Sequence, residues 1–120
     1  MPQVSSDGRT ADIPADKRLV LALEQDLGVD LLHKCGGNAM CTTCRVTFSA
    51  GEPDRMTAAE RERLQDRDLL GQARLSCQIL CDHDMEVEAL MRLSTAGVDD
   101  PGPTPADEVT PPPEWVTPPG

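Results

Sequence analysis

The five cysteines are the residues of this chain with the most evident chemistry. Three of them fall within the stretch HKCGGNAMCTTCRV, residues 33–46, and two follow further along the chain. Five residues separate the first cysteine from the second, two separate the second from the third, and 32 separate the third from the fourth. Clustered thiols bind zinc, hold iron–sulfur clusters or pair as disulfides. The cysteines are Cys35, Cys41, Cys44, Cys77 and Cys81.

Zinc and disulfides match this pattern less well than an iron–sulfur cluster. Structural zinc sites usually combine two short ligand pairs, whereas Cys77 and Cys81 are separated by three residues and make a poorer second pair. A secreted disulfide framework is disfavoured by the odd number of cysteines. The N-terminal stretch MPQVSSDGRTADIP also lacks a basic segment and an apolar run. We therefore expect a reducing, cytoplasmic environment, where clustered thiols serve metal or redox chemistry.

A [2Fe–2S] cluster accounts for the cysteine spacing best. Such a cluster needs four thiolates, and it commonly takes three from one loop and the fourth from a distant strand. Backbone N–H groups donate hydrogen bonds to its sulfides, which requires a closely wrapped loop with little side-chain bulk. Gly36, Gly37 and Ala39 permit that approach. His33 could also ligate iron, but four cysteines suffice, so we expect a loop or hydrogen-bonding role for it.

Two helices are predicted on either side of the cysteine loop. The first covers residues 17–28, where leucines recur every four residues; Asp16 is its expected cap, and Gly28 suits its C-terminal end. The second is a charged helix that begins at Thr57, which has capping-box spacing to Glu60.

Strands are predicted from alternating apolar residues and from turn signals. Asp7–Gly8 is typical of a type I′ hairpin turn. Single strands are expected at residues 44–49, 73–81 and 85–89, and in the second of these Cys77 and Cys81 would share one face. This order of strands and helices indicates an α+β domain with helices packed on one face of a mixed sheet.

Residues 94–120 differ from the rest of the chain in composition. They hold eight of the eleven prolines and five acidic residues, with no lysine or arginine. A segment of this kind cannot bury a core, so we expect a disordered, acidic, proline-rich tail after a domain of residues 1–93.

The charge of the chain limits its partners. The net charge is −10, and residues 1–93 carry −5 of it, from 16 acidic and 11 basic residues. This sign disfavours nucleic acid and favours a partner with a basic docking surface. No apolar stretch approaches the length that spans a bilayer, so we expect no membrane association.

The run CGGNAMCTTCRV, together with the later RLSCQ, resembles the adrenodoxin-type branch of [2Fe–2S] ferredoxins, including its bacterial members. The resemblance covers residues 1 to about 93. It implies a β-grasp fold and one [2Fe–2S] cluster per chain, with one electron carried per cluster. It also implies that the cluster ligands are Cys35, Cys41, Cys44 and Cys77. Cys81 is then left as a buried spare thiol.

We therefore expect a soluble one-electron carrier that is not itself an enzyme. It would be a monomer that moves electrons from a reductase to an acceptor enzyme, both of them redox proteins with basic docking surfaces. Two alternatives stay open: a cluster-containing redox sensor or cluster-assembly protein, and a zinc-stabilised interaction module.

Overall fold

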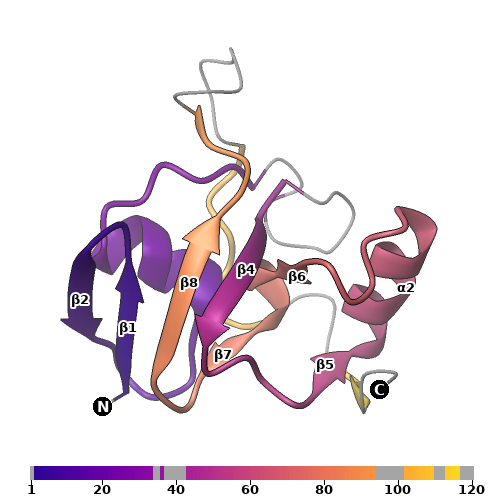
Figure 1. Ribbon diagram of the computed structural model, residues 1–120, viewed down its shortest axis with the longest axis horizontal. Coiled ribbons are helices and arrows are strands. Elements are labelled where there is room, and N and C mark those ends of the chain that lie inside the picture. The colour runs from indigo at the N-terminus through magenta and orange to yellow at the C-terminus, as the bar shows by residue number, and fades with distance from the viewer. Residues whose placement is uncertain (1, 34–35, 37–42, 94–101, 110–112, 117–120) are drawn as a thin grey trace.

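A five-stranded mixed sheet forms the centre of the molecule (Figure 1). The computed structural model describes residues 2–33, 36, 43–93, 102–109 and 113–116. The strand order is β2-β1-β8-β4-β6. Its strands are β1 Gln3–Ser6, β2 Arg9–Asp12, β4 Arg45–Ala50, β6 Arg74–Leu75 and β8 Met85–Ala89. Two small two-stranded sheets join β3 Lys17–Arg18 to β7 Leu80–Cys81, and β5 Met56–Thr57 to β9 Trp115–Val116.

The N-terminal hairpin forms as the sequence predicts. Asp7 and Gly8 have φ of 56° and 77°, and a type I′ turn requires positive φ at both positions. Strand β1 then lies parallel to β8 and antiparallel to β2, which makes the sheet mixed. The predicted strand at residues 85–89 is also confirmed, because Met85, Val87 and Ala89 are buried while the glutamates between them are exposed.

The first helix crosses one face of the sheet, but it begins later than predicted. An α-helical turn, Leu19–Leu21, continues as a π-helical turn, Ala22–Asp26. Asp16 does not cap it, because the two residues before Leu19 are extended and pair with β7 as strand β3. The end is as predicted, since Gly28 adopts φ of 66° after the last turn.

The second helix, α2 Ala58–Asp66, lies beyond the edge strand β6 (Figure 1). Thr57 caps it as predicted, with Oγ1 accepting from the Glu60 backbone N–H at 3.0 Å. The Glu60 carboxylate is fully buried and, instead of returning to the cap, accepts from Arg74 Nε at 2.8 Å and from the Leu75 N–H at 2.9 Å. The helix is therefore tied to β6 by a buried ion pair.

The prediction of one continuous strand over residues 73–81 is wrong. Strand β6 ends at Leu75, a 3₁₀ turn spans Ser76–Gln78, and the chain resumes as β7 in a different sheet. Ser76 explains the break, because both its N–H and its Oγ donate to the Cys44 carbonyl, at 3.3 and 2.8 Å. These bonds turn the chain toward the start of β4.

Two described parts of the C-terminal segment, residues 102–109 and 113–116, pack against the body. Strand β9 pairs with β5, the Ala58 N–H donates to the Glu114 carbonyl at 2.7 Å, and the Arg55 guanidinium lies 4.1 Å from the centre of the Trp115 ring. For these residues the structure differs from the expectation of a tail that makes no contact with the domain. The division into residues 1–93 and 94–120 stays a prediction. Among the described residues, no helix is long and apolar enough to cross a membrane.

Candidate iron–sulfur site

Cys44 and Cys77 lie side by side in the interior. Cys44 directly precedes β4, and Cys77 is the middle residue of the 3₁₀ turn. Their exposed fractions are 1% and 0%, and neither forms a disulfide. The two thiols form a hydrogen bond with each other, and the Ser76 bonds to the Cys44 carbonyl hold the two backbones together. Cysteines separated by 32 residues in the sequence thus supply adjacent sulfur atoms.

The electrostatics of this pair suit a metal. The hydrogen bond with Cys77 favours the protonated form of the Cys44 thiol, and together with the burial of the site it raises the pKa of Cys44 well above its usual value. Two neighbouring buried thiols cannot both ionise without a nearby positive charge, which an iron ion provides. Buried cysteine thiolates are the donor set that iron–sulfur clusters use. The two described cysteines therefore fit half of a [2Fe–2S] site.

The other two predicted ligands, Cys35 and Cys41, lie outside the described residues, so the full ligand set stays a prediction. Within the described part of the chain, no group of three or more His, Cys, Asp or Glu side chains is placed to hold a metal ion. Gly36 has φ of 71° and donates its N–H to the His33 carbonyl at 2.8 Å.

His33 has the hydrogen-bonding role expected from the sequence. Its side chain is 1% exposed, and its Nε2 pairs with the carboxylate of Glu24 from the first helix. Its Nδ1 has no hydrogen-bond partner among the described residues. The pair fixes the segment that enters the cysteine loop against the helix.

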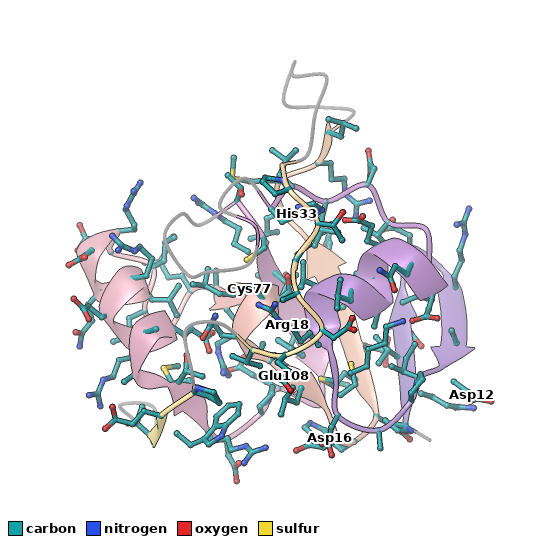
Figure 2. The ribbon with its side chains drawn as sticks, turned by 180° about the vertical axis from the view of Figure 1, so that it is seen from behind. Asp12, Asp16, Arg18, His33, Cys77 and Glu108 are labelled. Atoms are coloured by element: carbon teal, nitrogen blue, oxygen red, sulfur yellow. The ribbon has the colours of Figure 1, made fainter. Side chains whose placement is uncertain are left out.

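Two polar side chains that were not predicted from the sequence, Gln78 and Arg18, bond to Cys77, and Figure 2 shows Arg18 beside it. Gln78 Nε2 donates to the Cys77 sulfur at 3.6 Å, and Gln78 Oε1 accepts from Thr57 Oγ1 at 2.7 Å. Arg18 is fully buried and donates from Nε and Nη2 to the Cys77 carbonyl, at 3.0 and 2.6 Å. A sequence signal existed for Arg18, because it stands at the head of the apolar run LVLAL.

Cys81 is equally buried but has other surroundings. Its backbone pairs with Lys17 in the small β3–β7 sheet. Burial, with a smaller contribution from the charge of Asp82, raises the pKa of its thiol to about 12. It thus has the features of the buried spare thiol that the sequence predicts.

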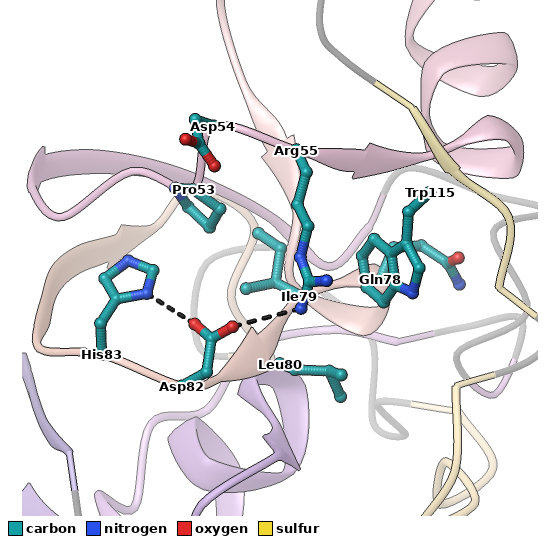
Figure 3. Close-up of a pocket in the computed structure, with 9 residues that line it drawn as sticks. All are labelled: Pro53, Asp54, Arg55, Gln78, Ile79, Leu80, Asp82, His83 and Trp115. Carbon is teal, nitrogen blue, oxygen red and sulfur yellow. Dashed lines mark hydrogen bonds and ion pairs between the residues drawn. The ribbon is translucent and has the colours of Figure 1, made fainter.

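One small hollow lies near β7 and β9 (Figure 3). It has a volume of about 70 Å³ and is lined by polar and apolar side chains, among them Arg55, Asp82, His83 and Trp115. Burial lowers the pKa of His83, but its hydrogen bonds to the Gly51 carbonyl and to Asp82 outweigh this and leave the pKa raised. At this volume the hollow does not form a substrate pocket.

Comparison with known proteins decides between the chemistries that the cysteines leave open. Residues 3–82 match the family model described as 2Fe-2S iron-sulfur cluster binding domain. The chain belongs to this family. It therefore contains a [2Fe–2S] ferredoxin domain with an α+β, β-grasp fold, and the resemblance found in the sequence is confirmed.

Solved structures of ferredoxins resemble this ferredoxin domain. The ISC-like [2Fe–2S] ferredoxin of Pseudomonas putida is 27% identical, with a TM-score of 0.59 over 73% of this chain and 91% of the other. A ferredoxin from Rhodopseudomonas palustris is 28% identical, with a TM-score of 0.52 over 76% of this chain and 98% of the other. A chain of the covalent putidaredoxin reductase–putidaredoxin complex is 26% identical, with a TM-score of 0.55 over 75% of this chain and 99% of the other.

Curated relatives are larger proteins. The ferredoxin domain is 33% identical over 69 residues to one subunit of the Na⁺-translocating NADH-quinone reductase of Shewanella denitrificans. This match covers 58% of the chain and 17% of the relative. The corresponding subunit of Neisseria gonorrhoeae is 31% identical, over 69% of the chain and 20% of the relative. The chain thus spans about a fifth of the length of these relatives.

Proposed function

We propose that this ferredoxin domain is a cytoplasmic one-electron carrier that moves electrons from a reductase to an acceptor enzyme. Its cluster would be held by Cys35, Cys41, Cys44 and Cys77. The observation that supports this assignment most strongly is the buried, adjacent Cys44–Cys77 pair, in a chain whose family binds [2Fe–2S] clusters.

The residues around the pair have clear tasks in such a carrier. When bound, a [2Fe–2S] cluster takes up and releases one electron. Burial of Cys44 and Cys77 keeps water from the two sulfur atoms, and the Gln78 amide donates a hydrogen bond to one of them. A donor to a ligand sulfur stabilises the added negative charge and so favours reduction. The chain supplies ligation, orientation and hydrogen bonds, as proteins generally do for a redox cofactor.

Partners with basic docking surfaces are part of this proposal. A solved relative is a chain of a complex between a reductase and putidaredoxin, which supports a reductase as electron donor. The net charge of −10 favours association with positive surfaces. Glu86 and Glu88 lie on the exposed side of β8, where they could contribute to docking. We propose a monomer that meets its donor and acceptor in turn.

A role in cluster assembly is the second candidate function. It is favoured by the similarity to a ferredoxin described as ISC-like. Such a protein would hand over its cluster, whereas a carrier keeps the cluster through many redox cycles. The family match gives no support to a zinc-stabilised module.

The experiment that tests the carrier proposal is a redox titration followed by turnover. We expect the full chain to take up one electron per cluster and to return it to an oxidant. After re-oxidation, the visible spectrum should equal that of the protein before reduction. The iron should stay with the chain when a cluster-free ferredoxin is added. Loss of iron to that acceptor within a few redox cycles would favour assembly instead.

A matched pair of variants tests docking. The double change Glu86→Gln and Glu88→Gln should slow reduction by a ferredoxin reductase at low salt and should have less effect at high salt. The double change Glu62→Gln and Asp68→Asn, at exposed positions in and just after α2, is the control, because it removes the same number of acidic charges elsewhere. Equal rates for all three proteins would contradict a docking role of β8.

A further inference from the structure

Arg18 is a fully buried cation bound to the backbone of Cys77 (Figure 2). We propose that Arg18 is a positioning residue that raises the reduction potential of the cluster. Its side chain also links the C-terminal segment to the turn that carries Cys77. This inference rests on the proposed function, since it requires Cys77 to be a cluster ligand.

The position of Arg18 is fixed by bonds to Cys77 and to the residues that follow it. Its backbone pairs with Leu80 in the β3–β7 sheet, and the next residue, Leu19, donates its N–H to the Ile79 carbonyl at 2.8 Å. Its side chain reaches back to the Cys77 carbonyl, where Nε and Nη2 both donate. The guanidinium therefore has little freedom to move away from the 3₁₀ turn.

The charge of Arg18 acts where screening is weak. The side chain has no exposed surface, and the Cys77 carbonyl that it contacts is only a few covalent bonds from the Cys77 sulfur. Reduction adds one negative charge to a cluster that four thiolates already make negative. A cation held nearby in a poorly screened interior stabilises that added charge more than it stabilises the oxidised state. The expected result is a higher potential.

A third bond connects Arg18 to the C-terminal segment. Nη1 donates to the Ala106 carbonyl at 2.8 Å, so one guanidinium holds both the ligand turn and residues 102–109. In the same segment Pro105 and Val109 are buried. Packing of this segment thus helps to keep Arg18 away from water and next to Cys77.

Two other cations of the chain serve as comparisons. Lys17 precedes Arg18 directly but reaches the surface, where its Nζ lies 2.6 Å from Asp26. Arg74 is also buried, but its bonds to the Glu60 carboxylate tie α2 to β6, so its removal would disturb the fold. Lys17 is the better matched control, because its removal changes the net charge by the same amount one position away.

The test is a redox titration of the full-length, cluster-loaded protein, monitored by absorbance and EPR, for Arg18→Gln, Arg18→Lys and Lys17→Gln. We expect Arg18→Gln to lower the equilibrium constant for reduction by about tenfold or more, which is about 59 mV for one electron. Arg18→Lys keeps the charge but loses the fork of donors, and we expect it to fall between Arg18→Gln and the natural protein. Lys17→Gln should be within about twofold of the natural protein, since the Lys17 ammonium is paired with Asp26 and partly exposed to screening solvent.

The potential separates this role from a purely structural one. A residue that only held the fold would lower the melting temperature of both Arg18 variants and leave the potential unchanged, and that result would overturn the proposal. If Arg18→Gln does not retain its cluster, Arg18→Met decides, because it removes the charge but keeps a long side chain: a lowered potential supports the proposal, and an unchanged one overturns it. A natural protein without any cluster would instead refute the proposed function itself.

Discussion

Cys77 and Cys81 are four positions apart in one segment, and both are completely buried, yet their surroundings differ. Cys77 contacts a second thiol, a side-chain amide and a buried guanidinium. Cys81 lies in the short strand β7, where its backbone pairs with that of Lys17 in β3. Burial alone therefore does not distinguish a ligand from a spare thiol. What distinguishes the predicted ligand Cys77 from Cys81 is the set of polar groups that contact it.

The break in the chain at the 3₁₀ turn produces this difference. An unbroken strand would place residues 77 and 81 on one face about 13 Å apart. The turn instead directs Cys77 toward Cys44, and the chain then enters another sheet with Cys81. The same segment thus contains one position built for ligation and one built for packing.

The largest expected effect separates the two thiols directly. Cys77→Ser should lose the cluster or shift its visible spectrum strongly, because a ligand sulfur is removed. Cys81→Ser is the matched control and should keep a near-normal spectrum with at most modest destabilisation. Absorbance and low-temperature EPR of the reduced proteins measure both. The opposite pair of results would move the fourth ligand to Cys81.

A second variant tests how much the buried ion pair between Glu60 of α2 and Arg74 of β6 stabilises the fold. Glu60→Ala leaves the buried Arg74 with only the longer contact to the exposed Glu52 carboxylate and frees the Leu75 N–H, so we expect a loss of about 3 kcal/mol in the free energy of unfolding. Glu62→Ala, at an exposed position of the same helix, should change it by less than about 0.5 kcal/mol. Equal denaturation midpoints for the two variants would show that the buried pair contributes no stability.

Alkaline pH should reveal the buried state of Cys81. Its thiol has a pKa of about 12 in the folded chain against an ordinary value of 9.0, so the folded state retains the proton more strongly. This contribution to stability is present below pH 9.0 and is lost as the pH rises toward 12, with a slope of about 1.4 kcal/mol per pH unit. Denaturation at several pH values should show a shallower decline for Cys81→Ser. Identical slopes would place the Cys81 thiol in contact with water.

The smallest effect concerns the link between α2 and the Cys77 turn. Thr57→Ala removes the helix cap and the donor to Gln78, and we expect a loss of about 1–2 kcal/mol in the free energy of unfolding. Thr57→Ser keeps the hydroxyl and should remain close to the natural protein. A serine variant as unstable as the alanine variant would show that the methyl group, rather than the hydroxyl, matters.

Local patterns predicted the elements that local physics determines. The hairpin at Asp7–Gly8, the cap at Thr57 and the alternating strand β8 depend on turn geometry, capping and burial periodicity, which neighbouring residues specify. Cysteine spacing and family resemblance predict that Cys44 and Cys77 bind the same cluster. The structure brings these two together, while Cys35 and Cys41 lie outside the described residues.

Features that depend on distant partners were missed. The strand over residues 73–81 reads as continuous, but Ser76 bonds to Cys44, far away in the sequence, and breaks it. Asp16 resembles a helix cap, yet the residues after it pair with β7. Strand β9 forms in a segment whose composition indicates disorder, because β5 offers it backbone partners. Composition and periodicity carry no information about such long-range bonds.

The central claim is that this chain holds a [2Fe–2S] cluster at the Cys44–Cys77 pair, and metal analysis of the purified full-length protein tests it most directly. Protein made with ample iron should contain two irons and two labile sulfides per chain, and after reduction it should give the EPR signal of a one-electron-reduced cluster. Stoichiometric zinc without iron or sulfide would contradict the claim.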